Sequence, residues 1–372
     1  MTAILRPTEP DGRGRAELAL VSPMRCAEET DAARRVLESG ALAQADEVAA
    51  FEQEFSDALV LDRPCVAVNS GTSGLHLGLL AAGIGPGDEV IVPSFTFAAT
   101  ANAVALTGAR PVFADIEPDT FCLSPDATAA AITARTAAIM PVHLFGHPAD
   151  LPRLSALAAR HGLALFEDAA QAHGASMNGV PVGSVGRFAM FSFYATKNMT
   201  SGGEGGMVSC ADRELERGVR LLRNQGMLQR YRNEVVGLNC RMSELHAALG
   251  RVQLARLREW NDRRRHNAER LTAGLPAAIT PVVRPGAVHV YHQYTIRVPE
   301  RRDEVATELR EQFGIGSGTF YPIPVHELPS FGLGLDLPET RRAAAEVLSL
   351  PVGPHVTDAD ADRIVHAVNS LV

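Results

Sequence analysis

Seven short apolar segments run through the first half of the sequence, and stretches with helical periodicity, such as residues 151–160, alternate with them. Parallel strands need a crossover connection, which is usually a helix. Repeated strand–helix–strand units therefore predict an α/β fold built on a mostly parallel, seven-stranded sheet. The predicted strands are residues 65–69, 89–92, 111–115, 137–142, 163–167, 188–194 and 206–209.

A long helical pattern begins at Ser243 and is broken at Gly274 and Pro276. Glycine and proline are poor residues for a helix interior, so the pattern predicts a helix that ends there. Apolar residues at intervals of three and four predict one buried stripe along this helix. The stripe consists of Leu245, Leu249 and Val252, with Trp260 further along.

The break after the long helix also marks the predicted change of domain. A chain of 372 residues exceeds the roughly 250–300 residues that one core usually holds. We therefore predict a flexible segment at 1–22, a large domain at 23–273 and a smaller C-terminal α/β domain at 274–372. The elements expected in the small domain are a strand at 291–298 and helices at 303–313 and 339–348.

Lys197 stands between an aromatic-rich predicted strand and a cluster of glycines at 202, 203, 205 and 206. Apolar surroundings disfavour the ammonium form of a lysine, which lowers its pKa and makes a nucleophilic amine available near neutral pH. Glycines let the backbone approach a ligand closely. The alternative is a lysine on a turn with its ammonium group in water.

Glu167 and Asp168 lie at the carboxyl end of the strand predicted at 163–167, the edge at which open α/β sheets bind ligands. Asp168 alone could be a helix cap or an ion-pair partner. Together with Lys197 it suggests a pyridoxal phosphate site, because a carboxylate there keeps the pyridine nitrogen of that cofactor protonated.

The turn at residues 70–75, Ser-Gly-Thr-Ser-Gly-Leu, leads from a predicted strand into a predicted helix that has Leu75, Leu79 and Ala82 on one face. A helix N-terminus binds phosphate through its free N–H groups and its dipole. Serine and threonine at a helix start are also ordinary caps, so this motif alone is weak evidence for a phosphate site. It supports one in combination with the motifs that contain Lys197 and Asp168.

Five motifs in this order resemble the DegT/DnrJ/EryC1/StrS aminotransferases, from about Pro23 to the C-terminus. This family has the fold type I architecture of pyridoxal phosphate enzymes, and its members aminate ketosugars that are commonly linked to nucleotides. The motifs are Asn-Ser-Gly-Thr-Ser-Gly-Leu at 69–75, Pro-Ser-Phe-Thr-Phe-Ala-Ala-Thr at 93–100, Glu-Asp-Ala-Ala-Gln-Ala-His-Gly at 167–174, Phe-Ser-Phe-Tyr-Ala-Thr-Lys-Asn at 191–198 and Gly-Leu-Asn-Cys-Arg-Met-Ser-Glu at 237–244.

The resemblance implies catalytic roles for Lys197, which would bind the cofactor covalently and then move the proton, and for Asp168, which would hold the pyridinium N–H. Gln171 would contact the phenolic oxygen of the ring. Phe97 stands where the family stacks an aromatic ring on the cofactor, although it could instead be a core residue. Phe95 lies two positions away, and alternate residues of a strand share a face.

The resemblance also implies a phosphate site and a partner subunit. Gly71, Thr72, Ser73 and Ser192 would receive the cofactor's phosphate. Asn239 and Arg241 match a segment that in the family reaches across a homodimer interface to the partner's cofactor, and the sequence leaves open which of the two makes the contact. We therefore expect a homodimer with its active sites at the interface.

Substrate contacts are expected from three further residues. Tyr321 and His326 lie in Tyr-Pro-Ile-Pro-Val-His, which resembles a family segment near the substrate and is stiffened by its prolines; a merely rigid loop is the alternative. His143 follows the end of a predicted strand and could touch cofactor or sugar. His173 could stack near the cofactor or close a polar turn.

These assignments predict a two-step amino transfer, from a donor such as glutamate to a nucleotide-linked ketosugar, with ping-pong kinetics. Family analogy favours C4 of dTDP-4-keto-6-deoxyglucose, as in amino-deoxysugar biosynthesis, and a C3-ketosugar or a cyclitol ketone is the alternative. A dehydratase is disfavoured, because family members with that activity carry histidine in place of Lys197. A cofactor-binding protein without turnover is the alternative of another class.

Composition and targeting features agree with a cytoplasmic enzyme. Five dispersed cysteines without a C-x-x-C pair are typical of a reduced compartment, and we predict no metal site. The first twenty residues lack a continuous apolar stretch, so no signal peptide is expected, and no segment has the apolar length of a membrane span. The net charge of -8 gives no indication of a nucleic-acid surface, and the Arg263, Arg264 and Arg265 run is expected to be a solvated helix face.

Overall fold

The central sheet contains all seven predicted strands. In the computed structural model, which describes residues 17–276 and 279–372, they pair in the order β1-β9-β8-β5-β4-β2-β3. Strand β9 runs antiparallel to β1 and β8, and the remaining pairs are parallel, so the predicted mostly parallel α/β sheet is confirmed. The strands are β1 Cys65–Val68, β2 Glu89–Pro93, β3 Arg110–Ala114, β4 Thr136–Ile139, β5 Ala164–Asp168, β8 Phe188–Ser192 and β9 Gly206–Cys210.

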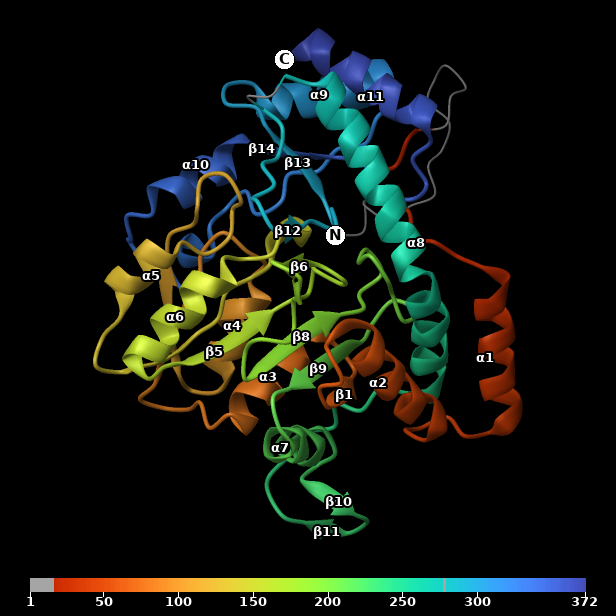
Figure 1. The fold of residues 1–372 in the computed structure, drawn as a ribbon, viewed down its shortest axis with the longest axis vertical. Helices are drawn as coiled ribbons and strands as arrows, with labels where there is room; N and C mark the ends of the chain where they lie inside the picture. The colour runs from red at the N-terminus through yellow and green to blue at the C-terminus, as the bar shows by residue number, and fades with distance from the viewer. Residues whose placement is uncertain (1–16, 277–278) are drawn as a thin grey trace.

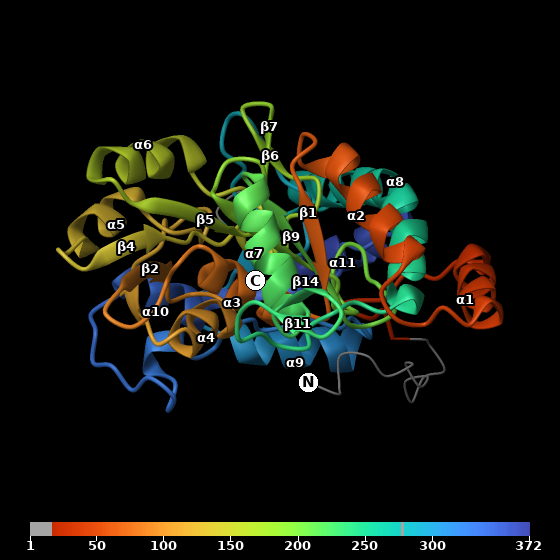
Figure 2. The ribbon, with the colours of Figure 1, turned by 90° about the horizontal axis from the view of Figure 1, so that it is seen from below.

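Helices cover both faces of this sheet (Figure 2). Alternate side chains of β8 enter different cores: Phe188 and Met190 pack with α3, α4 and α7, whereas Ala189 and Phe191 pack with α2 and α8. Because both faces are buried, the strands read as continuous apolar runs. The covering helices are α2 Asp46–Leu59, α3 Gly71–Ala81, α4 Ala99–Leu106, α5 Pro125–Ala131, α6 Leu151–His161 and α7 Arg213–Arg223, and the 3-10 turn η2 is Leu144–Gly146.

Helix α8, Glu244–Gly274, runs from beside α1 and α2 up to α9 and α11 and ends at the predicted glycine (Figure 1). Its first half packs on α2 and on α1, Ala27–Ser39, and its last turns enter the core of the small domain. The predicted stripe is out of phase: Leu245 and Val252 are half-buried against α1, while the fully buried positions include Ala247 and Leu257. The helix is buried on two sides, which a single stripe does not describe.

The small domain is formed by an antiparallel strand pair, β13 and β14, between helices α9 and α11 (Figure 1). The predicted helix at 339–348 ends at Glu346, and the apolar residues Val347 and Leu348 begin β14. The bounds are β13 Tyr294–Arg297, α9 Arg302–Phe313, η3 Val325–Glu327, α10 Pro338–Glu346, β14 Val347–Leu350 and α11 Asp358–Leu371.

Two segments cross the predicted domain boundary, which itself stays a prediction. Strand β12, Ala287–Val288, follows the boundary but pairs with β6, Ser176–Met177, whose other neighbour is β7, Val180–Pro181. Of the segment predicted to be flexible, residues 1–16 lie outside the described residues. Leu18 within its remainder forms a β-bridge to Ile315 of the small domain.

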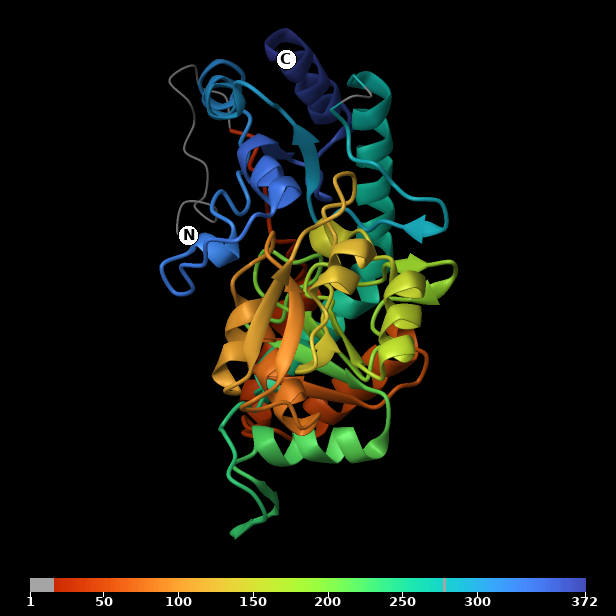
Figure 3. The same ribbon diagram turned by 90° about the vertical axis from the view of Figure 1, so that its left-hand side faces the viewer.

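A short hairpin of β10, Met227–Gln229, and β11, Arg232–Asn233, projects from the large domain beyond α7 (Figure 3). Tyr231 at its tip is 82% exposed, and Val236 after it is 96% exposed. Large apolar side chains in such positions often mark an interaction surface. As far as the chain is described, none of its helices combines the length and apolar character needed to cross a membrane.

Candidate active site

A cavity of about 440 Å³ lies at the carboxyl ends of the parallel strands. The residues that follow β1, β2, β4, β5 and β8 all contribute to its wall, so side chains from distant parts of the sequence meet here. This is the edge at which open α/β sheets bind ligands. Its lining includes Lys197, Asp168, Gln171, Phe97, Tyr321 and Ser192.

Lys197 reaches the cavity from a tightly pinned loop after β8. Its own N–H donates to Tyr194, and the Thr200 hydroxyl donates to the Phe193 carbonyl at 2.8 Å. Burial disfavours the ammonium form and lowers the pKa of Lys197 to about 8, while the nearby Asp168 carboxylate acts in the opposite direction. Across the described residues, the amine makes no hydrogen bond to another side chain or to the backbone. Lys197 therefore presents a partly deprotonated, available nucleophile.

Asp168, at the end of β5, is 4% exposed. One of its oxygens accepts a hydrogen bond from the Thr100 hydroxyl at 2.8 Å, and the other accepts from the Ala170 N–H at 3.2 Å. Burial raises the pKa of Asp168, and these hydrogen bonds and Lys197 oppose that rise. The carboxylate is thus a fixed acceptor within the cavity wall.

Gln171 connects two distant segments of the cavity wall, at Phe145 and Tyr321. Its side-chain carbonyl accepts the Phe145 N–H at 2.7 Å, and its amide donates to the Tyr321 hydroxyl at 2.8 Å. Burial raises the pKa of Tyr321 well above its ordinary value, so the phenol stays protonated. Both side chains line the cavity.

The first turn of α3 forms one end of the cavity. Ser70 caps the helix, because its hydroxyl accepts the Ser73 N–H at 3.1 Å, and the Ser73 hydroxyl is paired with it at 2.9 Å. The N–H groups of Gly71 and Thr72 have no protein acceptor in the described part of the chain. Gly71 is packed so closely that a Cβ there would lie 3.0 Å from Ser192. Gly71, Thr72 and Ser192 line the cavity, whereas Ser73 serves as part of the cap.

The two phenylalanines of the motif at 93–100, Phe95 and Phe97, have different surroundings. Phe97 is 56% exposed and lines the cavity, whereas Phe95 is fully buried and packs edge-on against Tyr321. The core alternative for Phe97 is therefore excluded, and Phe95 is the core residue.

The structure does not bring His143 and His326 to the cavity. His143 is fully buried on the opposite face of the sheet, where its Nε2 lies 3.2 Å from Glu167 and its Nδ1 accepts the Ala149 N–H. His326 is also fully buried, and its Nδ1 lies 2.6 Å from the Ser94 hydroxyl. Both side chains hold loops in place, so the prediction that they contact substrate has no support in this geometry.

Asn239 and Arg241 lie outside the cavity wall as well. Asn239 is exposed, and Arg241 donates to the Asn224 side chain at 2.6 Å. His173 is fully buried against Phe191 and does not line the cavity, so it does not stack there. Arg264, expected on a solvated face, is 7% exposed and donates to the Tyr291 carbonyl instead.

Several cavity residues were not predicted from the sequence. Thr100 belongs to the motif at 93–100 and follows Phe97 by three residues. Near a helix start, this spacing places two side chains on the same face, so it indicates that Thr100 lies close to Phe97. Val21, Glu204, His292 and Gln293 carried no comparable signal, because their places in the wall depend on contacts between distant segments.

Comparison with known proteins agrees with this arrangement. The family model described as the DegT/DnrJ/EryC1/StrS aminotransferase family matches residues 23–369. The chain is 46% identical over 348 residues to the dTDP-3-amino-3,4,6-trideoxy-α-D-glucose transaminase of Streptomyces venezuelae, covering 91% of each chain. It is 45% identical to the UDP-N-acetyl-3-dehydro-α-D-glucosamine 3-aminotransferase of Acidithiobacillus ferrooxidans, covering 82% of this chain and 83% of that one.

A solved structure shares the fold as well. The crystal structure of S. venezuelae DesV in complex with a ketimine intermediate superposes with a TM-score of 0.89 and 44% sequence identity, covering 92% of this chain and 94% of that one. The chain therefore belongs to the DegT/DnrJ/EryC1/StrS aminotransferase family and is a pyridoxal phosphate-dependent transaminase.

Proposed function

We propose that this enzyme transfers an amino group from an amino acid, glutamate by family analogy, to the ketone of a nucleotide-linked sugar. The observation that carries the proposal is the meeting of Lys197 and Asp168 in one cavity at the carboxyl edge of the sheet. The names of the two relatives, a dTDP-sugar transaminase and a UDP-sugar aminotransferase, support the substrate class.

The residues of the cavity fit pyridoxal phosphate. The Lys197 amine is available to the aldehyde, and Asp168 offers a buried carboxylate to the ring nitrogen. The unpaired N–H groups of Gly71 and Thr72 suit a phosphate, as does the close packing that excludes a side chain at Gly71. The exposed ring of Phe97 offers a surface on which the cofactor can stack.

Each of these residues then has a distinct task. Bound pyridoxal phosphate supplies an electron sink for the electrons left when the donor loses its α proton. Lys197 would hold the cofactor through its Nζ and, when that amine is free, would take the α proton of the donor. Asp168 would keep the ring nitrogen protonated. Gln171 would contact the phenolic oxygen of the ring, and its amide donates to the Tyr321 hydroxyl, which lines the same cavity.

We further infer that the aminated carbon is C3. Family analogy from the sequence favoured C4 of dTDP-4-keto-6-deoxyglucose, but the names of both relatives place the amino group at C3. A sugar with its ketone at C4 is the competing substrate. The position of the amino group in the product distinguishes the two substrates.

A homodimer with active sites at its interface is the proposed assembly. Lys197 is the one arginine or lysine side chain among the described residues that line the cavity, yet the cofactor and a nucleotide diphosphate both carry phosphate charges. Further cations must then come from outside this chain's own cavity wall. The segment after the projecting hairpin, with the exposed Val236 and Asn239 and the half-buried Arg241, is suited to reach a second copy.

A panel of nucleotide 3-ketosugars and 4-ketosugars, incubated with glutamate, tests the function directly. We expect an aminated product from a 3-ketosugar, identified by NMR, and parallel lines in initial-rate plots at varied glutamate. Amination confined to C4 would contradict the inferred position. If glutamate and other amino donors failed to convert the bound cofactor to its aminated form, the transaminase proposal itself would be overturned in favour of a dehydratase or a binding protein.

A further inference from the structure

Thr100 is the only side chain among the described residues that hydrogen bonds to Asp168. It lies in the first turn of α4, is 1% exposed, and lines the cavity with Asp168. Its hydroxyl is 2.8 Å from one carboxylate oxygen. Two weaker neighbours compete for the same hydroxyl, the Phe97 carbonyl at 3.3 Å and the Thr96 hydroxyl at 3.4 Å.

A threonine hydroxyl has one proton to donate. The shortest contact identifies Asp168 as its acceptor, and a hydrogen bond donated to a carboxyl group is stronger when that group is ionised than when it is protonated. The hydrogen bond therefore favours the ionised form and fixes the direction in which the carboxylate points. The Ala170 N–H holds the second oxygen at 3.2 Å.

We propose that Thr100 is a positioning residue, whose hydroxyl keeps the Asp168 carboxylate ionised and aimed so that it can pair with the pyridinium N–H of the bound cofactor. The inference rests on the proposed role of Asp168 and adds a residue that the active site needs for that role.

Two titratable groups share the cavity with Asp168, namely Lys197 on the loop after β8 and Tyr321 across the cavity. His143 after β4 lies on the other face of the sheet, beside Glu167. Burial raises the pKa of Asp168, and the hydrogen bond from Thr100 is the largest opposing influence, ahead of Ala170, Lys197 and His143. Removing the hydroxyl should therefore extend the neutral form of Asp168 to higher pH.

The test compares Thr100→Val with Thr100→Ser in otherwise intact, full-length protein. The affinity of cofactor-free protein for pyridoxal phosphate is measured by titration at several pH values. Thr128→Val is the matched control, because Thr128 is also a fully buried helical threonine, but its hydroxyl donates to the Ser124 carbonyl. Thr100→Ala reports the same quantities if the valine variant fails to fold.

We expect Thr100→Val to bind pyridoxal phosphate about tenfold more weakly, equivalent to ~1.4 kcal/mol. The loss of affinity toward acid pH should also begin about one unit higher than in wild type. Thr100→Ser should restore both values, and Thr128→Val should change neither.

A double-mutant comparison separates positioning from a general structural effect. In an Asp168→Ala background, Thr100→Val should cause no further loss of affinity. An additive loss there, or wild-type affinity and pH dependence in Thr100→Val, would overturn the inference. If Asp168→Ala alone kept wild-type affinity and pH dependence, the proposed role of Asp168 would fail, and the role of Thr100 with it.

Discussion

The amine of Lys197 differs from that of an exposed lysine because its surroundings penalise the charged form more than Asp168 stabilises it. Its pKa falls from 10.5 to about 8, so a large fraction is neutral only slightly above physiological pH. An amine that must react with carbonyl groups benefits from this shift.

Acylation of Lys197 in cofactor-free protein should follow this pKa, with a midpoint near pH 8. Lys197 is the only lysine in the sequence, so peptide mass spectrometry reads its modification without interference from other lysines. In an Asp168→Asn variant the midpoint should move to lower pH, because the carboxylate that favours the ammonium form is gone. A midpoint close to 10.5 in wild type would contradict the proposed burial of the amine.

Glu167 shows why neighbouring residues of one strand have different tasks. Asp168 faces the cavity, so Glu167 points to the other face of β5. There it is fully buried and accepts N–H groups of Gly183, Val185 and Gly186 at 2.7–3.0 Å, in addition to its contact with His143. Burial alone would raise the pKa of Glu167, but these contacts lower it below 4.5.

Glu167→Gln should therefore lower the free energy of unfolding by about 3 kcal/mol, because an amide N–H₂ would replace an acceptor that several donors need. Denaturant unfolding at pH 7 measures this loss, with the exposed Glu38→Gln as control. The folded pKa is depressed, so the stabilisation is present above pH 4.5 and is lost as the pH falls through the folded pKa. If Glu167→Gln were as stable as Glu38→Gln, the contacts of the Glu167 carboxylate would not contribute to stability.

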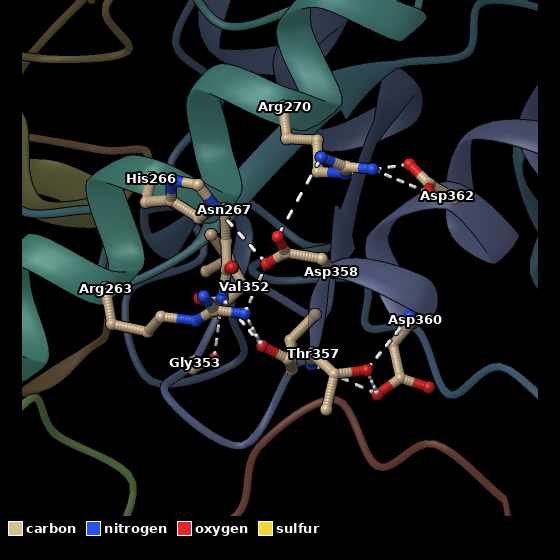
Figure 4. A network of polar contacts seen from close by, with 11 residues as sticks. Arg263, His266, Asn267, Arg270, Val352, Gly353, Thr357, Asp358, Asp360 and Asp362 are labelled. Carbon is tan, nitrogen blue, oxygen red and sulfur yellow. Dashed lines mark hydrogen bonds and ion pairs between the residues drawn. The ribbon is translucent and has the colours of Figure 1, made fainter.

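At the scale of elements, α8 contacts residues 352–362 through the buried side chain of Asn267 and through exposed charged side chains (Figure 4). The side-chain amide of Asn267, fully buried, lies 3.0–3.3 Å from the carbonyls of Val352, Gly353 and Val356. The ion pair of Arg270 with Asp362 beside it is exposed to solvent. Buried hydrogen bonds to carbonyl groups contribute more than exposed ion pairs, which water and salt screen.

Asn267→Ala should consequently destabilise the protein by about 2 kcal/mol, since the hydrogen bonds of the buried amide are lost; the carbonyls of Gly353 and Val356 keep the Val356 N–H and Arg263 as donors. Arg270→Ala, on the same helix, should leave the free energy of unfolding unchanged. Thermal and denaturant unfolding of both variants gives the comparison. The reverse ranking would mean that the charged surface carries the domain contact.

Elements were predictable from the sequence where local pattern decides them, and less so where distant contacts do. All seven sheet strands and the end of α8 at Gly274 follow from apolar runs and helix breakers. The helix predicted at 339–348 ended early, because Val347 and Leu348 pair with β13 rather than complete a turn. Arg264 was expected in solvent because its sequence neighbours are arginines, but it meets a backbone carbonyl of a segment that lies 27 residues further along the chain.

At the scale of the whole molecule, the active site also combines residues that local sequence identifies with residues that only contacts between distant segments bring there. The sequence identified Lys197, Asp168, Gln171, Phe97 and Tyr321, all of which meet in the cavity. It could not separate them from His143 and His326, because which side of the sheet or loop a histidine faces depends on packing between segments far apart. Thr100 and His292 enter the wall for the same reason.

The whole-molecule prediction concerns the sharing of active sites between two copies. Asn239 and Arg241 lie outside the cavity of their own chain, in the segment that follows the projecting hairpin; Asn239 is exposed, and Arg241 is half-buried and forms a β-bridge to Val68. If they serve the partner's cavity, a Lys197→Ala chain and an Arg241→Ala chain are each inactive as homodimers. A mixed dimer of the two then contains one intact site, because both defects fall in the other site.

Co-expression of these two chains in equal amounts should restore about a quarter of wild-type activity, since half of the dimers are mixed and each has one working site. The same assay with Asn239→Ala in place of Arg241→Ala shows which of the two residues reaches the partner. A Lys197→Ala chain paired with an Asp168→Ala chain is the control, because both residues line the cavity of their own chain. In that pairing each site contains one defect, and activity stays absent. If the Lys197→Ala and Arg241→Ala pair also stayed inactive while forming stable mixed dimers, each active site would be complete within one chain, and the shared-site assembly would be wrong.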